Sequence, residues 1–194
     1  NDSDGNPFKT RQGGTKPLSE LFDETYNYIK NINTTLSHST ITHLTNSVLT
    51  FSDLITNRKT DYKFDLEKFT NVNGKTGIYI QYSQVRAKKL IETIDKHKEE
   101  IKELILNKTD KQLLSKLFLF SHYLEQSALL NEPHHLANYL YEISNLFNQF
   151  YENEKLTSIT DPNQIASKLY IINLFLTTSH NTMFCLGILP VGEM

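Results

Sequence analysis

The chain of 194 residues is long enough to bury a sizeable core, and its 38% hydrophobic and 22% charged residues are typical of a soluble globular protein. A formal net charge of −2 gives no global sign of a nucleic-acid binder, although residues 67–130 carry a small positive surplus. The single cysteine, Cys185, excludes an internal disulfide framework, and its apolar surroundings, MFCLGIL, predict a buried thiol in a reducing cytosol.

The first part of the chain predicts a loop followed by two helices. Residues 1–15 are polar and glycine-rich, which is typical of a loop. Apolar residues then recur at helical spacing over residues 18–36 and again over 41–55. Alternating polarity around Tyr62 and Phe64 favours a short extended segment.

The rest of the chain predicts a bundle of about four helices joined by short loops. Asn73-Gly74 turns the chain before the first helix, and Thr109 with Gln112 forms a capping box for the second. Prolines open the last two helices, and Gly187 could close the last. The expected helices cover about residues 77–107, 110–130, 133–153 and 162–187.

The sequence shows no catalytic or metal-binding pattern. Its seven histidines lack metal-ligand spacing, and the adjacent His134 and His135 are expected on different sides of a helix, so no metal site is expected. Cys185 has no evident base, and there is no Walker loop or GxGxxG motif. No apolar run reaches the length that spans a membrane.

Two segments could nevertheless bind a ligand. Lys9, Thr10 and Arg11 lie between glycines in a cationic loop suited to a polyphosphate, although a solvated surface loop is the other interpretation. In GKTGIYIQYSQVR, residues 74–86, Tyr79 and Tyr82 share a helix face. Their rings could stack on unstacked bases, or they could be ordinary core residues.

Four segments of this sequence resemble arginyl-tRNA synthetases, in the same order along the chain. DGNPFKTRQGGTKPLSELFDE resembles the end of the class I catalytic domain, where the second signature loop lies. DYKFDLEKF followed by NGKTGIYIQYSQVRAKKL is similar to the entry into the helical anticodon-binding domain. EPHHLANYLYEISNLFNQFYENEKL and LGILPVGEM are similar to a later helix and the C-terminal ending of that family.

The resemblance implies a mainly α fold: a helical anticodon-binding bundle at residues 67–194, preceded at 1–66 by the tail of a class I, Rossmann-type catalytic domain. It implies a parent arginine–tRNA ligase that uses ATP with Mg²⁺ and L-arginine to charge arginine tRNA, as a cytoplasmic monomer. The other class I signature, His-Ile-Gly-His, is absent, so this piece alone is expected to be inactive and to need no cofactor.

The resemblance also implies roles for single residues. Lys9, Thr10 and Arg11 fall on the signature loop that closes over ATP and pyrophosphate in the full-length enzyme. The positions that match the anticodon-binding region are Lys68, Phe69, Asn71, Tyr79, Gln81, Tyr82, Ser83, Arg86, Tyr151 and Met194. Lys75 and Ile78 depart from the usual Asn and Pro, and the ending lacks the usual Arg before the last Met.

The genetic code supplies a reason for such a pocket, because every arginine anticodon has cytosine in the middle. A pocket for cytosine needs a stacking surface, an acceptor for the amino group and walls that reject a purine. Two alternatives remain: a helical scaffold or protein-interaction module that keeps the fold without binding RNA, and an unrelated enzyme that uses the loop at residues 4–15 for a nucleotide.

Overall fold

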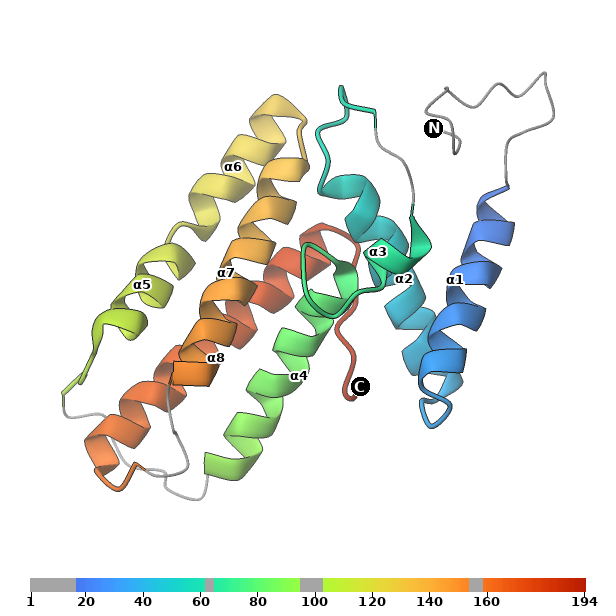
Figure 1. Ribbon diagram of the computed structural model, residues 1–194. Helices are drawn as coiled ribbons and strands as arrows, with labels where there is room; N and C mark the ends of the chain where they lie inside the picture. Colours follow the sequence, from blue (N-terminus) through green and yellow to red (C-terminus); the bar gives the residue numbers. More distant parts are fainter. Residues whose placement is uncertain (1–16, 62–64, 95–102, 154–158) are drawn as a thin grey trace.

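The computed structural model describes residues 17–61, 65–94, 103–153 and 159–194. Within these ranges every regular element is a helix, which confirms the predicted mainly α fold (Figure 1). In chain order the helices are α1 (Leu18–Ile32), α2 (His38–Leu54), α3 (Leu66–Phe69), α4 (Gly77–Ile94), α5 (Lys108–Leu117), α6 (Phe120–Leu130), α7 (His134–Asn153) and α8 (Pro162–Cys185).

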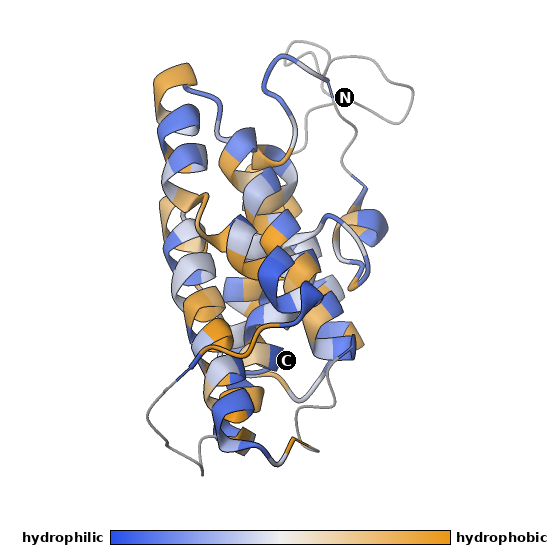
Figure 2. Cartoon of the chain, turned by 90° about the vertical axis from the view of Figure 1, so that its left-hand side faces the viewer, coloured by the Kyte–Doolittle hydropathy of each residue, from blue (hydrophilic) through white to orange (hydrophobic). Residues whose placement is uncertain are grey.

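Helices α4, α5, α7 and α8 form the main bundle, with α6 packed on α7. Its core is built from large apolar side chains, and the rings of Phe147 and Phe175 stack with centroids 4.1 Å apart. Each such side chain contributes about 1.5–3 kcal/mol when it is fully buried. Figure 2 shows hydrophobic and hydrophilic residues alternating along the helices, as expected for amphipathic helices around a shared core.

A second, smaller core joins α1 and α2 to α4 and to the C-terminal segment. Ile29 of α1, Val48 of α2, Val85 of α4 and Val191 of the C-terminal segment are all buried in it. The segment after α8 therefore lies against α4 and α2 rather than in solvent (Figure 1).

Helix α2 approaches α4 most closely at Gly77. A Cβ atom on Gly77 would lie 2.2 Å from the carbonyl oxygen of Ser47 and 2.8 Å from the backbone nitrogen of Val48. Both atoms belong to the backbone of α2, so neither can move aside cheaply. Glycine at this position is what allows the two helices to pack at this distance.

A buried ion pair ties α5 to α8. The Lys168 ammonium lies 2.7 Å from both carboxylate oxygens of Asp110, and both residues are almost completely buried. One Asp110 oxygen also accepts a hydrogen bond from the backbone N–H of Asn107, whose side chain accepts from the Asp110 N–H. Lys168 thus neutralises the buried Asp110 carboxylate, which also caps the start of α5.

Several expected helix ends are confirmed. Helix α7 starts after Pro133, and α8 starts at Pro162 with Asp161 as its N-cap. Gly187, at φ 72°, closes α8, with its own N–H donating to Phe184 and the Ile188 N–H donating to Met183. None of the helices that the structure describes is long and apolar enough to cross a bilayer.

Other expectations from the sequence are wrong. The helix expected over 77–107 is shorter than predicted, because residues 103–107 are not helical. In this segment the Ile105 N–H donates to the Ser167 hydroxyl. The helix expected over 110–130 is broken after Leu117. The capping box is formed by Asn107 and Asp110 rather than by Thr109 and Gln112, because Asp110 also meets Lys168.

Cys185 is exposed rather than buried. It ends α8 on the outer side of the helix, whereas Met183 and Leu186 face the core. The extended segment expected around Tyr62 and Phe64 lies outside the described residues.

We expect Gly77→Ala to lower the free energy of unfolding by about 1–3 kcal/mol, because the added methyl group must push α4 away from α2. Urea denaturation followed by circular dichroism measures the change. The matched control is Gly192→Ala, where an added Cβ meets no heavy atom within 4 Å. Equal stability of the two variants would contradict the close approach.

Candidate nucleic-acid interface

The loop between α3 and α4 is held by its own polar side chains. The Thr76 hydroxyl donates to the Asn71 carbonyl at 2.6 Å and accepts from the Tyr79 N–H at 3.1 Å. Gly74, at φ 140°, supplies a backbone conformation that side-chain-bearing residues rarely adopt. The loop therefore has a defined shape before any ligand binds.

This loop presents the polar and cationic residues that the sequence singled out. Lys68 and Asn71 are exposed and Phe69 is half-buried, and all three line a hollow of about 610 Å³. Lys75 lines the same hollow, and its ammonium lies 5.3 Å from the centroid of the Tyr141 ring. The hollow thus combines cations with apolar walls.

Tyr79 stands beside a second tyrosine on α7. The centroids of the Tyr79 and Tyr141 rings are 5.6 Å apart, and the Tyr79 hydroxyl donates to the Asn145 side-chain oxygen at 3.3 Å. Burial raises the pKa of Tyr79 above its ordinary value, so its hydroxyl stays protonated and can act as a donor. Both rings are half-buried.

Arg86 lies between two aromatic rings. Its guanidinium carbon is 4.2 Å from the centroid of the Tyr82 ring and 4.7 Å from that of Tyr151. The guanidinium also donates to the Tyr82 hydroxyl at 2.9 Å and to the Asn148 side-chain oxygen at 3.2 Å. An exposed carboxylate, that of Glu152, lies 3.7 Å away and offsets part of the charge. Tyr82 and Arg86 of α4 thus meet Tyr151 of α7, which is distant in the sequence, in one cluster.

Gln81 and Ser83 have no exposed surface, so neither can touch a ligand in this conformation. The Ser83 hydroxyl donates to the Tyr79 carbonyl at 2.9 Å and accepts from the Asn148 amide at 2.8 Å. Direct contact with a base, which the sequence suggested for Ser83, is therefore not available to this side chain. Its position instead joins α4 to α7 beneath Tyr79.

Gln81 fastens the C-terminal segment to α4. Its amide nitrogen donates to the Leu189 carbonyl at 2.7 Å and to the Ser47 hydroxyl at 2.6 Å. Its oxygen accepts from the Val191 N–H at 2.9 Å. The Lys88 ammonium donates to the Val191 carbonyl at 3.0 Å, so this cation is used within the protein.

The fastened segment places Met194 beside Tyr82. Both line an apolar hollow of about 240 Å³ between α1, the loop after α3 and α4, to which Val72 and Ile78 also contribute. Met194 is half-buried there. The structure thus brings Tyr82, Arg86 and Tyr151 together, places Met194 in a hollow that Tyr82 also lines, and leaves Gln81 and Ser83 as supports.

One predicted group, Lys9, Thr10 and Arg11, lies outside the described residues. Three residues that were not predicted, Tyr141, Asn145 and Asn148, contact Tyr79 or Arg86. Their spacing is a signal that was available, because positions 141, 145, 148 and 152 lie on one face of a helix.

Comparisons with known proteins agree with this architecture. The sequence profile of the DALR anticodon binding domain matches residues 80–194. Arginine–tRNA ligase of Francisella tularensis subsp. novicida is 36% identical over an alignment of 170 positions that covers 83% of this chain and 29% of that protein. The enzyme of the same name from Streptomyces coelicolor is 31% identical over an alignment of 199 positions that covers 96% of this chain and 33% of that protein.

Solved structures show the same fold at lower identity. Thermus thermophilus arginyl-tRNA synthetase superposes with a TM-score of 0.82 at 19% identity, over 94% of this chain and 33% of that one. Arginyl-tRNA synthetase from Plasmodium falciparum superposes with a TM-score of 0.75 at 23% identity, over 91% of this chain and 33% of that one. This chain therefore spans about a third of the length of the proteins it matches.

The fold and the interface define an all-α module with a surface of aromatic rings and cations. The profile match covers more than half of the chain, and the chain belongs to the DALR anticodon binding domain family.

We expect Gln81→Leu to lower the free energy of unfolding by about 1–3 kcal/mol, because it leaves the buried Val191 N–H without its partner. Carboxypeptidase should also release the C-terminal residues faster from this variant. Gln112→Leu, at an exposed position of α5, is the control and should change neither property. Unchanged stability and unchanged digestion of the Gln81 variant would show that the segment is held by its apolar contacts alone.

Proposed function

We propose that this chain is the C-terminal part of an arginine–tRNA ligase and that it recognises the anticodon of arginine tRNA. The observation that carries the proposal is the cluster around Arg86, in which a cation lies between the rings of Tyr82 and Tyr151. Membership of the DALR family and the arginine–tRNA ligases among the relatives support it.

The proposed mechanism is the recognition of bases turned out of their stack. Each base presents a flat π-face, and stacking on an aromatic side chain is worth about 1–3 kcal/mol. Tyr79 and Tyr141 offer such rings on one side of the cluster, with Lys75 beside them. Lys68, Lys75 and Arg86 can meet phosphates, which position the RNA without reading its sequence.

Reading the middle cytosine requires hydrogen-bond acceptors as well as a ring. The side-chain oxygen of the half-buried Asn145 lies beside Tyr79 in the interface. Met194, at the end of the segment held by Gln81, lines the same hollow as Tyr82, and its carboxylate would be another acceptor. Because unstacked bases are read one by one, this recognition does not require a positive net charge on the chain, whose formal net charge is −2.

The whole parent enzyme would supply the remaining chemistry. It would use ATP with Mg²⁺ and L-arginine in a catalytic domain whose tail is residues 1–66, as a cytoplasmic monomer. Lys9, Thr10 and Arg11 would contact ATP and pyrophosphate in that enzyme, whereas this chain alone would need no cofactor. The alternative of a scaffold without RNA binding is not favoured, because a scaffold gives no reason for the Arg86 cluster.

We expect Tyr79→Ala to weaken the binding of arginine tRNA by about 1–3 kcal/mol, or roughly 5- to 150-fold in Kd, because a stacking ring is lost. Fluorescence anisotropy with labelled tRNA measures the Kd, and circular dichroism shows whether the variant is folded. Tyr79→Phe keeps the ring and should stay close to wild type.

The matched control is Tyr170→Ala, which removes a partly exposed tyrosine from α8. It should leave the Kd unchanged. If Tyr79→Ala is folded and binds as tightly as the control, Tyr79 is not part of the interface.

A further inference from the structure

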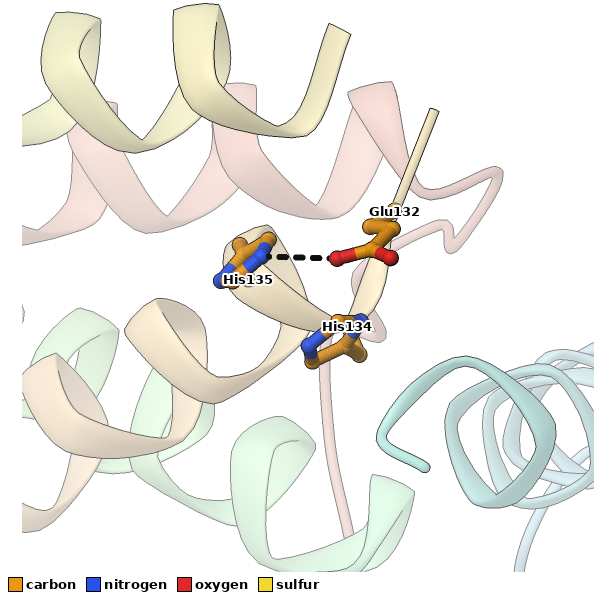
Figure 3. Close-up of side chains that lie close together, drawn as sticks. All are labelled: Glu132, His134 and His135. Carbon is orange, nitrogen blue, oxygen red and sulfur yellow. Dashed lines mark hydrogen bonds and ion pairs between the residues drawn. The ribbon is translucent and has the colours of Figure 1, made fainter. Parts of the chain in front are cut away.

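The turn between α6 and α7 brings a carboxylate and two imidazoles together (Figure 3). Asn131 ends α6 in the left-handed region at φ 51°, and the chain then enters α7 through Glu132 and Pro133. The rings of His134 and His135 have centroids 4.1 Å apart. The sequence-based expectation that these two histidines lie on different sides of the helix is therefore wrong.

The spacing of the three groups suits a small cation. One ligand atom from each of Glu132, His134 and His135 lies within 4.8 Å of the other two. The His135 Nε2 and the Glu132 Oε2 are 3.2 Å apart. A tetrahedral zinc ion with bonds of about 2.1 Å holds its ligand atoms about 3.4 Å apart. The His135–Glu132 pair is close to that spacing, and the ligand atom of His134 lies within 4.8 Å of both.

The Nδ1 atom of His134 also suits a metal, because it is buried and has no hydrogen-bond partner among the described residues. Imidazole nitrogens and carboxylate oxygens are ordinary ligands of zinc in proteins.

Two positive groups oppose a cation here, and both are weak. The Lys59 ammonium lies 3.3 Å from Oε1 of Glu132, whereas Oε2 faces the ring of His135, and the Lys59 side chain is 72% exposed. The positive end of the α7 dipole also opposes a cation, but its effect is small beside direct coordination by three ligands.

We infer that Glu132, His134 and His135 form a binding site for a divalent transition metal, with Zn²⁺ as the best fit to two imidazoles and one carboxylate. Water completes the coordination. Three ligands from four consecutive residues tie the α6–α7 turn to the first turn of α7, so the bound metal stabilises this end of the bundle.

Isothermal titration of the untagged chain with ZnCl₂ at pH 7.5 tests the inference. The expected result is one zinc ion per chain, together with a higher Tm when zinc is present. Glu132→Gln and His135→Ala should each weaken binding by about tenfold or more. His180→Ala, at an exposed histidine of α8, should not change it.

The Lys59→Ala variant tests the geometry independently. Removing the ammonium that shares the Glu132 carboxylate should tighten zinc binding. No saturable uptake by the wild-type chain would overturn the inference, and so would uptake that survives in the folded Glu132→Gln and His135→Ala variants. Weaker binding in Lys59→Ala would contradict the competition that the structure shows.

Discussion

The close approach of α4 to α2 at Gly77 is the constraint on which the interface depends. Because the first residue of α4 has no side chain, its backbone packs directly on the backbone of Ser47. One turn later, Gln81 reaches the Ser47 hydroxyl and holds the C-terminal segment on the same face. The position of Met194 beside Tyr82 follows from these contacts. A wider separation of the two helices would loosen all of them together.

Helix α4 makes a polar contact with each of its three neighbours. Gln81 bonds to Ser47 of α2, Gln84 donates to Ser179 of α8, and Ser83 accepts from Asn148 of α7. Buried polar groups are costly unless they are paired, so each pair favours a single register between α4 and its neighbour. The contacts with α2, α7 and α8 therefore fix the rotation of α4 about its axis and its position along that axis. This helix carries the rings of Tyr79 and Tyr82.

The sequence predicted the parts of the fold that local signals determine. Proline and the N-cap residue Asp161 located the start of α8, and the glycine at position 187 located its end. Periodicity alone extended two helices too far, because neither residues 103–107 nor the break after Leu117 contains a proline or glycine that would mark a helix end. The capping box was placed two residues too late, because Asn107 and Asp110 form it, and Asp110 also pairs with the buried Lys168 of α8.

The sequence predicted the residue types of the candidate interface but not which of these residues are buried. The aromatic and cationic residues Tyr82, Arg86 and Tyr151 were found from the resemblance, and the structure brings them together. Burial was not predictable, because Gln81 and Ser83 look like available polar residues until their partners from α2, α7 and the C-terminal segment are known. The approach of His134 to His135 depends on side-chain rotamers that helical spacing does not specify.

The most direct test of this account compares the binding of the chain to arginine tRNA with its binding to the same tRNA carrying U in place of the middle C of the anticodon. Fluorescence anisotropy at one fixed, low salt concentration gives both Kd values. The account predicts a clear loss of affinity on this single change, because the interface reads individual bases. Equal affinity for the two tRNAs would contradict it and would leave a surface that contacts only the RNA backbone.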